Sequence, residues 1–398
     1  MAKRVVVTGM GIISALGVGK DAHLNALKEE KSGVGKINYL ETKHTDIPSG
    51  EVKMSDDEMK SLLGIASDSI ITRTPLMGKI ALKEAIQESG ITDALRVAFI
   101  NGTTVGGMEK SEKYYMDFFE GKHTDYIAAH DCGAGTEVIA ETFGKFDLIT
   151  TLSTACSSAV NSIILGGELI RSGRVDAAIV GGAESLSKFH LNGFNTLMIL
   201  DRKVCNPFDS QRNGLNLGEG AAYIVIESEE SAKSRNAEIL CELKGYGNAC
   251  DAYHQTASSP TGEGAYLAMK KALDNAGLSA SEIDYINAHG TGTTNNDLCE
   301  SVSLKRIFGE KVPYFSSTKS LTGHATSAAG GIESVISILA LINDVVPSCQ
   351  QFQSPIEETG LIPVLNSLKN VRLNNVMNNS FGFGGNDSSC IFSKIKER

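Results

Sequence analysis

Residues 81–91 read Ala81-Leu82-Lys83-Glu84-Ala85-Ile86-Gln87-Glu88-Ser89-Gly90-Ile91, and a related run follows 187 residues later as Ala268-Met269-Lys270-Lys271-Ala272-Leu273-Asp274-Asn275-Ala276-Gly277-Leu278. In both runs apolar side chains recur at helical spacing, and a glycine stands where a helix would end. We therefore predict helices over Ala81–Ser89 and Ala268–Ala276. Each run is followed by a strand-like run and then by a Gly-Thr pair.

The repeated run predicts that the chain consists of two similar halves, residues 1–235 and 236–398. A long-period repeat is typical of a solenoid, but two copies of a very long period predict a pseudo-symmetric pair of domains with a site between them. Apolar runs of strand type alternate with helical patterns around the repeat, which favours an α/β fold with a covered sheet. These runs are Val5–Thr8, Val97–Ile100, Ala177–Val180 and Tyr223–Glu227.

Composition excludes several functional classes. The 398 residues carry a formal net charge of -10, which argues against general nucleic-acid binding. The eight cysteines form no Cys-x-x-Cys pair, so we expect reduced thiols in a cytoplasmic protein. The apolar run that begins at Val5 is too short for a signal peptide. The uncharged stretch from Leu148 to Gly167 contains too many Ser, Thr and Asn residues for a membrane span, so we expect no membrane association.

Cys156 is the candidate nucleophile. It lies in Thr154-Ala155-Cys156-Ser157-Ser158-Ala159, between a predicted strand (Asp147–Leu152) and a predicted helix. The N-terminus of a helix favours the thiolate, and the small neighbouring side chains let the chain turn and a substrate approach. A sulfur that folding brings to two distant histidines would suit acyl transfer through a thioester. The alternative is a buried structural cysteine.

The two histidines lie in short polar segments of the second half. His289 follows a strand-like run (Ile283–Ala288), and His324 precedes a predicted helix of small residues, Ala325–Leu341. Lys319 stands in an apolar run, so it must be paired or solvated, and we predict Glu300 as its partner. The alternatives are a histidine that is hydrogen-bonded in a loop and an ordinary salt bridge between Lys319 and Glu300.

Glycines mark three further segments. One is a loop whose flexible glycines would allow Phe383 to move as a gate: Ser380-Phe381-Gly382-Phe383-Gly384-Gly385-Asn386-Asp387. The free backbone N–H groups of this loop would bind an oxyanion. Gly218-Glu219-Gly220 lacks the Lys-Ser or Lys-Thr of a phosphate loop and is interpreted as a turn before a strand. Gly9-x-Gly11 has Ser14 at the third glycine position, which argues against a dinucleotide fingerprint.

Taken together, the chain resembles the elongating, type II-like β-ketoacyl-acyl-carrier-protein synthases of the thiolase superfamily over essentially its whole length. The matching motifs are Thr154–Ala159, Asn206–Asp209 with Gly218–Ala221, Asp251–Thr256, His289–Thr293, Lys319 with Gly323-His324, and Gly382–Gly385. The resemblance implies a thiolase-like α/β fold, with two duplicated α-β-α-β-α halves in a five-layered pseudo-symmetric structure. It also implies a homodimer. The Cys-His-His set separates this class from initiating ketoacyl synthases and plant polyketide synthases.

The activity that the resemblance implies is decarboxylative Claisen condensation. Malonyl-acyl-carrier protein would condense with an acyl thioester on Cys156 to give 3-oxoacyl-acyl-carrier protein, in fatty-acid or related polyene- or polyketide-type biosynthesis. His289 and His324 would stabilise the malonyl enolate. No metal and no organic cofactor is implied beyond the phosphopantetheine arm that the carrier protein supplies.

The resemblance also implies supporting roles around these three residues. The backbone N–H groups of Cys156 and Phe383 would bind the oxyanion, and Phe383 would act as a gate. Lys319 and Glu300 would position the histidines. Thr256, Thr291 and Thr293 would bind the pantetheine arm, and Val105 would line the acyl pocket.

The chain departs from the family pattern at two places. Asn386-Asp387 replaces the usual Thr-Asn, which adds an acid near the site, and Asn206 replaces an arginine of the carrier-docking surface. Arg202, Lys203 and Arg212 are candidates to replace that arginine. These changes favour a specialised pathway. Two other functions stay open, namely a catalytically degenerate partner subunit that binds carrier protein and a thiolase-type enzyme that uses coenzyme A.

Overall fold

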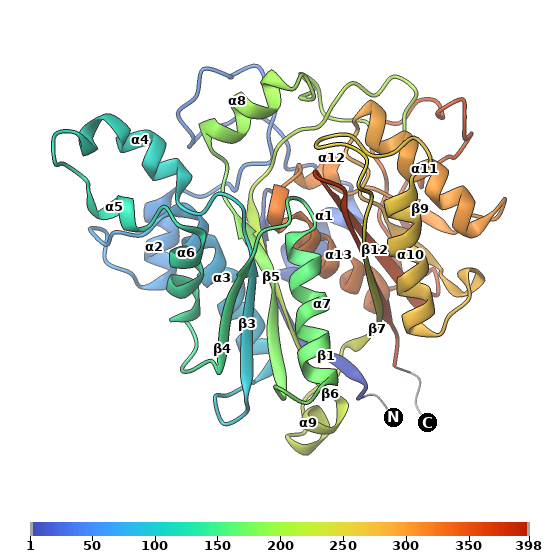
Figure 1. Ribbon diagram of the computed structural model, residues 1–398, viewed down its shortest axis with the longest axis horizontal. Helices are drawn as coiled ribbons and strands as arrows, with labels where there is room; N and C mark the ends of the chain where they lie inside the picture. The colour runs from blue at the N-terminus through green and yellow to red at the C-terminus, as the bar shows by residue number, and fades with distance from the viewer. Residues whose placement is uncertain (1–2, 396–398) are drawn as a thin grey trace.

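The computed structural model describes residues 3–395, which form an α/β fold around one large mixed sheet (Figure 1). Across the sheet the strands follow in the order β4 (Leu148–Leu152), β3 (Val97–Gly102), β5 (Ala177–Glu184), β6 (Gly220–Ser228), β1 (Val5–Ser14), β7 (Cys241–Cys250), β13 (Asn386–Ser393), β12 (Asn375–Gly382), β8 (Tyr285–Asn287) and β9 (Tyr314–Ser316). The short β2 (Gly17–Val18) pairs with the end of β1. The strands that precede residue 235 thus occupy one side of the sheet and the later strands the other.

Four helices cover and separate the two sides of the sheet. On the first side, α3 (Arg73–Ser89) packs against β1 and β6, and on the second, α10 (Glu263–Ala276) packs against β7 and β13. Between the two sides, α7 (Ser158–Arg171) and α13 (Ala329–Asn343) contact each other and strands of both. The layers are therefore α-β-α-β-α, as the resemblance implied. The division of the chain at residue 235 stays a prediction.

Shorter elements surround these layers. The helices are α1 (Lys20–Glu29), α2 (Asp56–Leu63), α4 (Met108–Phe118), α5 (Asp125–Ala128), α6 (Cys132–Ala140), α8 (Lys188–Thr196), α9 (Glu229–Ser234), α11 (Thr294–Phe308) and α12 (Lys319–Thr322). Two 3₁₀ helices are η1 (Ala280–Glu282) and η2 (Thr326–Ala328), and β10 (Val345–Val346) pairs with β11 (Leu368–Lys369).

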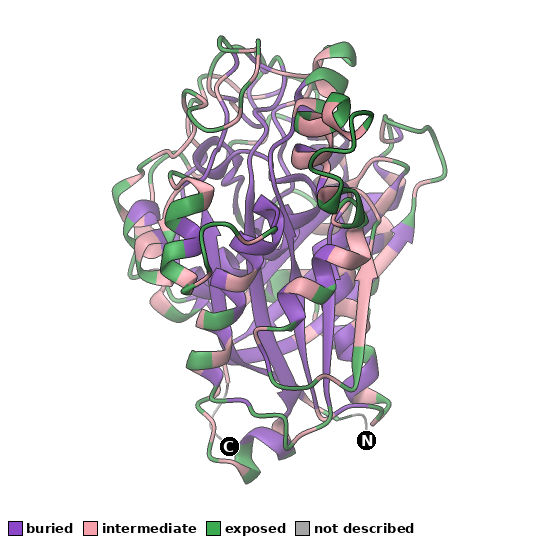
Figure 2. Ribbon diagram, turned by 90° about the vertical axis from the view of Figure 1, so that its left-hand side faces the viewer, coloured by how far each residue is buried: buried purple, intermediate pink, exposed green. Residues whose placement is uncertain are grey.

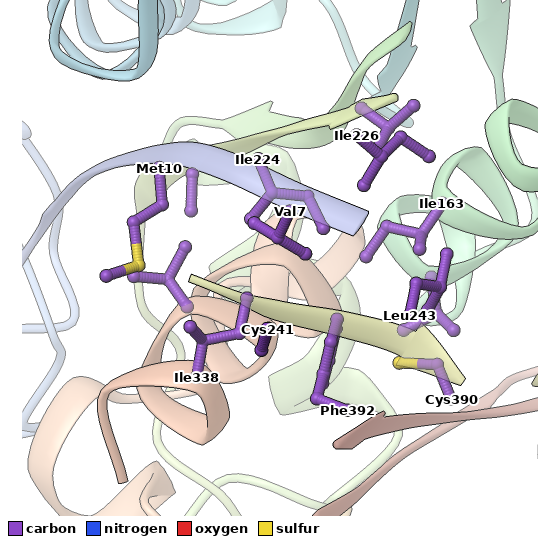
Figure 3. Close-up of a cluster of buried hydrophobic side chains, with 14 of the residues drawn as sticks. Val7, Met10, Ile163, Ile224, Ile226, Cys241, Leu243, Ile338, Cys390 and Phe392 are labelled. Carbon is purple, nitrogen blue, oxygen red and sulfur yellow. The ribbon is translucent and has the colours of Figure 1, made fainter. Parts of the chain in front are cut away.

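The central core joins both sides of the sheet. Figure 3 shows Val7 of β1, Ile163 of α7, Ile338 of α13 and Phe392 of β13 meeting in one cluster of buried side chains. Full burial of an aliphatic side chain contributes roughly 1.5–3 kcal/mol, so this shared cluster stabilises the two sides against each other. The strands are buried along most of their length, whereas exposed residues concentrate in the surrounding helices and loops (Figure 2).

Glycines explain how the repeated helices approach their strands. A Cβ on Gly9 or Gly11 of β1 would lie 2.6 Å or 2.0 Å from a backbone oxygen of α3. On the other side, a Cβ on Gly245 or Gly247 of β7 would lie 2.5 Å or 2.4 Å from a backbone oxygen of α10. Gly9 and Gly11 therefore admit a helix, which confirms that they are no dinucleotide fingerprint.

The predicted elements are present with different limits: β1, β3, β5 and β6 are longer than predicted, whereas β4 and β8 are shorter and α13 begins four residues later than predicted. Strand β1 continues through Gly9 and Gly11 to Ser14, because β6 pairs with it along its whole length. Helix α3 begins eight residues before the predicted start, at Arg73. The segment Thr326–Asn343, which includes α13, is long and apolar enough to span a membrane, but 89% of it is buried inside the protein. It is a core helix here.

Candidate active site

A tight turn between β4 and α7 carries Cys156. Ala155 adopts a left-handed backbone conformation with φ 53°, and the hydroxyl of Ser158 accepts from the N–H of Thr154 and donates to the carbonyl of Ala155. Such a conformation costs about 1–3 kcal/mol in a residue other than glycine, and the surrounding hydrogen bonds hold it. The predicted strand–turn–helix setting is confirmed, and Cys156 is 5% exposed.

Both histidines lie beside this sulfur. The Nε2 atom of His324 is 3.1 Å from the Sγ atom of Cys156. The rings of His289 and His324 are nearly perpendicular, with centroids 5.3 Å apart. Their elements converge at one end of the sheet, where α12 lies near the start of α7 (Figure 1). The fold therefore brings together the three residues that the sequence singled out.

Lys319 contacts His289 but does not pair with Glu300. Its Nζ atom donates to the carbonyl of His289 at 2.5 Å, lies 3.4 Å from His289 Nδ1 and forms a buried ion pair with Glu333. The predicted Lys319–Glu300 pair is therefore wrong. Glu333 is the one Asp, Glu, Lys or Arg residue between residues 320 and 343, and this isolated charge was the sequence signal for the true partner.

Glu300 holds the backbone of the histidine segment instead. Its carboxylate accepts from the N–H groups of His289 and Gly290, at 2.9 Å and 2.8 Å, and from the side-chain amide of Asn379 at 3.3 Å. It is fully buried on α11, directly behind that segment. Glu300 is thus a positioning residue that acts on the main chain of His289.

Burial dominates the proton affinities at the site. Burial and the Lys319 charge hold the pKa values of His289 and His324 well below the usual value, so both imidazoles are neutral at pH 7. Burial raises the pKa of the Cys156 thiol to about 11, although Lys319 and the N–H of Phe383 act in the opposite direction. Desolvation therefore outweighs the helix N-terminus, which by itself would favour the thiolate. His324 is placed to accept the thiol proton during attack.

Phe383 lies in the turn between β12 and β13 and closes the site on that side. Its ring stacks on Phe194 of α8 with centroids 5.7 Å apart. Gly384 and Gly385 adopt positive φ, and the backbone N–H of Gly384 donates to the carbonyl of Gln255. The backbone N–H groups of Phe383 and Cys156 both lower the pKa of the Cys156 thiol, so both act on the sulfur. Both N–H groups therefore lie close to the sulfur, and their role as oxyanion donors stays a prediction.

A cavity of about 260 Å³ leads from Cys156 to the surface. It is lined by both histidines and by Thr256, Thr291 and Thr293, as predicted for a pantetheine site. The lining of this cavity does not include Val105, which is buried in the loop after β3.

The same three donors also have the composition of a metal site. Cys156 Sγ and one nitrogen of each histidine lie within 4.8 Å of one another, and thiolate with imidazole is a donor set that zinc prefers. The Lys319 ammonium beside His289 opposes a second cation there.

The two departures from the family pattern have different consequences. Arg212 is buried and donates to the carbonyls of Asp209, Thr293 and Thr294, so it is wrong as a docking residue. Arg202 and Lys203 are exposed, although Arg202 pairs with Asp46.

Burial favours the neutral form of the added acid, Asp387. It is buried, and burial together with the charges of Asp251 and Glu300 raises its pKa to about 8. Its neighbour Asn386 accepts from the side chains of Ser157 and Asn161 at 2.9 Å and 2.7 Å. The altered pair therefore braces the nucleophile turn without adding negative charge.

Comparisons with known proteins agree with this site. The family model described as beta-ketoacyl synthase, N-terminal domain, matches residues 2–232, and the C-terminal domain of the same family matches residues 240–353. Cys156 falls in the first matched region and both histidines in the second. The chain belongs to the β-ketoacyl synthase family and has the thiolase-like fold.

Individual relatives are similar over their full length. The 3-oxoacyl-[acyl-carrier-protein] synthase 2 of Coxiella burnetii is 35% identical over 99% of both chains. The solved structure of the ishigamide ketosynthase/chain length factor superposes with a TM-score of 0.92, at 30% identity and full coverage of both chains. A type II polyketide synthase complex, AntDE:AntF, in which the acyl-carrier protein is bound to its ketosynthase, gives a TM-score of 0.86 at 26% identity, with 99% of this chain and 100% of that chain covered.

Proposed function

We propose that this protein condenses an acyl group held on Cys156 with a malonyl group delivered by acyl-carrier protein. The observation that carries the proposal is the contact of His324 Nε2 with Cys156 Sγ at 3.1 Å, with His289 beside it and Lys319 behind. The relatives named as 3-oxoacyl-[acyl-carrier-protein] synthases and the AntDE:AntF carrier complex support the same reaction.

Acyl transfer comes first. The sulfur of Cys156 attacks the carbonyl carbon of an acyl thioester, and its proton passes to His324 Nε2. The N–H groups of Cys156 and Phe383 hold the oxyanion; loss of one such donor typically costs about 10²–10³ in rate. The carrier thiolate leaves as the carbonyl re-forms, and it takes the proton from His324. The products are the acyl-enzyme and free carrier thiol.

Condensation follows when malonyl-carrier protein enters the cavity. Lys319 donates toward His289 Nδ1, so the ring proton resides on Nε2, where it can be donated to the malonyl thioester oxygen. Once the sulfur is acylated it offers His324 no proton, and the Nε2–H tautomer of this ring supplies a second donor. The bond to the carboxylate breaks, CO₂ leaves, and the electron pair forms the enolate. The enolate carbon bonds to the acyl carbonyl carbon, and the bond to sulfur breaks to release Cys156 as a thiolate, which takes up a proton from water to restore the thiol.

Replacing His289 with alanine should separate the two steps. Acyl-enzyme formation, measured by intact mass, should stay close to wild type, because His289 takes no part in it. Release of CO₂ from malonyl-carrier protein should fall by about 10²–10³-fold, the usual cost of one oxyanion donor. The exposed His123 provides the control variant, His123→Ala, which should behave as wild type. Equal loss of both steps in His289→Ala would contradict the assignment.

Carrier dependence tests the substrate class. The wild-type protein should form a ketoacyl product from malonyl- and acyl-carrier protein, and much less from the coenzyme A thioesters. Equal turnover of acyl-coenzyme A would instead favour a thiolase-type enzyme. If no ketoacyl product forms with any acyl length, the remaining function is that of a carrier-binding subunit.

We further propose that the protein is a homodimer formed along β4. This strand ends the sheet order, so among residues 3–395 no strand pairs with its outer edge. Leu148 on β4 itself is exposed, and further exposed apolar residues lie on α4 and the turn after it, including Met116 at 72% and Phe119 at 74% exposure. An unpaired edge strand and exposed apolar side chains are both sites for association.

Light scattering should therefore give twice the chain mass of 42.3 kDa. The variant Met116→Asp/Phe119→Asp should shift the protein toward the monomer, whereas Ile362→Asp, at another exposed apolar position, should not. A monomeric wild-type protein would refute the dimer.

A further inference from the structure

A second cavity, of about 240 Å³, lies apart from the catalytic one, and among residues 3–395 the two share no lining residue. The starts of α2, α4 and α8 and the loop at 39–41 contribute to its walls (Figure 1). Six acids and four bases line it: Glu41, Asp56, Asp57, Glu109, Glu112, Glu219, Arg73, Lys110, Lys113 and Lys188. The mechanism above uses none of these residues.

Five of these charged groups form one network at the cavity. Arg73 donates to both oxygens of Glu219 and, at 3.0 Å, to Asp56. Lys110 pairs with the other oxygen of Asp56 at 2.6 Å. Glu109 joins the network through the backbone N–H of Arg73, from which its Oε1 accepts at 2.7 Å. Two cations thus face three carboxylates, and the network is one positive charge short.

Glu109 carries the carboxylate that the network leaves uncompensated. Its side chain lies in the first turn of α4 and is 8% exposed. Among residues 3–395 no group donates to its buried Oε2. Burial raises the pKa of Glu109 to about 7, although the charge of Lys110 and the N–H of Arg73 act in the opposite direction. Either a proton or a bound cation must therefore complete this group.

The available donors suit an organic cation better than a metal ion. Mg²⁺ and Ca²⁺ take six or more oxygen ligands, whereas the oxygens of Asp56 and Glu219 already accept from the neighbouring side chains. A primary ammonium needs only acceptors, because it brings three N–H donors of its own. Leu40 and Leu186 also line the cavity and would contact a short aliphatic chain.

The mouth of the cavity offers charges for the far end of such a ligand. Glu41 and Asp57 are exposed there, and neither forms an ion pair within the described part of the chain. The same holds for Lys113 and Lys188. The acids would hold a second ammonium, and the lysines would hold a carboxylate.

We propose that this cavity is a binding site for a small aliphatic primary amine, whose ammonium donates to Glu109 Oε2. A hydrogen bond between an ammonium and a carboxylate is charge-assisted, and burial strengthens it. The site lies outside the proposed condensation, so binding of the amine does not depend on that reaction.

Isothermal titration calorimetry of the wild-type protein with butylamine, putrescine and 4-aminobutyrate tests the proposal. Butylamine should bind saturably at one site per chain, and butyrate, which lacks the ammonium, should not. Tighter binding of putrescine would assign the mouth to its acids, and tighter binding of 4-aminobutyrate would assign it to its lysines.

Two variants locate the amine. Glu109→Gln keeps an acceptor for the N–H of Arg73 but removes the charge, and it should raise the Kd at least about tenfold. Asp57→Lys adds a cation at the exposed mouth and should also weaken binding, which guards against misfolding of the first variant. Glu120→Gln, the same substitution at an exposed position just beyond α4, is the control and should bind as the wild type does.

The pH dependence gives an independent readout. The amine displaces the proton from Glu109, so its affinity should rise between pH 6 and pH 8. Tyr126 of α5 also faces this group, but burial raises the pKa of its phenol above the usual value, so it stays neutral in this range. The rise should be absent in Glu109→Gln.

Weaker binding in both cavity variants, with an unchanged control, supports the proposal. Equal binding of butylamine to the wild type and to Glu109→Gln overturns it, and so does the absence of binding to the wild type at millimolar amine. Acylation of Cys156, measured on the same preparation, reports separately on the proposed function.

Discussion

Replacing Cys156 with alanine should abolish acyl-enzyme formation and lower condensation by at least about 10³-fold, because no other group lies at the focus of the two histidines and the two backbone donors. The alanine side chain fits the same turn, so the fold should be retained. Intact mass after incubation with acyl-carrier protein and chromatographic measurement of the ketoacyl product give the two readouts.

The other cysteines provide the control. Cys250 is exposed at the end of β7, and Cys250→Ala should acylate and condense as the wild type does. Continued acylation of Cys156→Ala would place the nucleophile at another residue and would remove the basis of the site described above.

Replacing Lys319 with methionine should cause the second large loss. The ammonium holds His289 and neutralises Glu333, and both charged groups are nearly inaccessible to water. Removing one partner of a buried pair typically costs about 3–5 kcal/mol. Chemical denaturation should show this loss of stability, and CO₂ release from malonyl-carrier protein should fall together with condensation, because the His289 ring is no longer oriented.

A second substitution separates the two effects. Lys319→Met/Glu333→Leu replaces the ion pair with apolar residues and should recover most of the stability, since such replacements are often neutral or stabilising. Condensation should stay low in the double variant. Full activity in the stable double variant would show that the pair is purely structural.

The main features of the fold could be predicted from the sequence because the two repeated runs consist of residues with strong local conformational preferences. Gly90 and Gly277 end the two repeated helices in the left-handed conformation, as predicted. The limits of the strands were harder to predict. β5 runs on through Gly181 and Gly182, where the neighbouring strands, and no local preference, maintain the extended chain.

The sequence predicted which residues form the site, but it did not predict which charged side chains pair with each other. Cys156, His289 and His324 stand out because each lies in an uncharged, glycine- or serine-rich segment. The partner of Lys319 depends on which helix packs against it, and it is α13 that brings Glu333 there, whereas Glu300 on α11 faces the backbone of His289. The protonation of Cys156 likewise depends on burial, which a sequence does not display.

The most direct test of the central claim is the fate of an acyl group on the protein. After incubation with hexanoyl-carrier protein, peptide mass mapping should place the hexanoyl group on Cys156, and malonyl-carrier protein should then consume that adduct and yield 3-oxooctanoyl-carrier protein. In the His324→Ala variant, malonyl-carrier protein should not consume any hexanoyl adduct that forms on Cys156. A hexanoyl group on another residue, or an adduct on Cys156 that malonyl-carrier protein never consumes, would contradict the account.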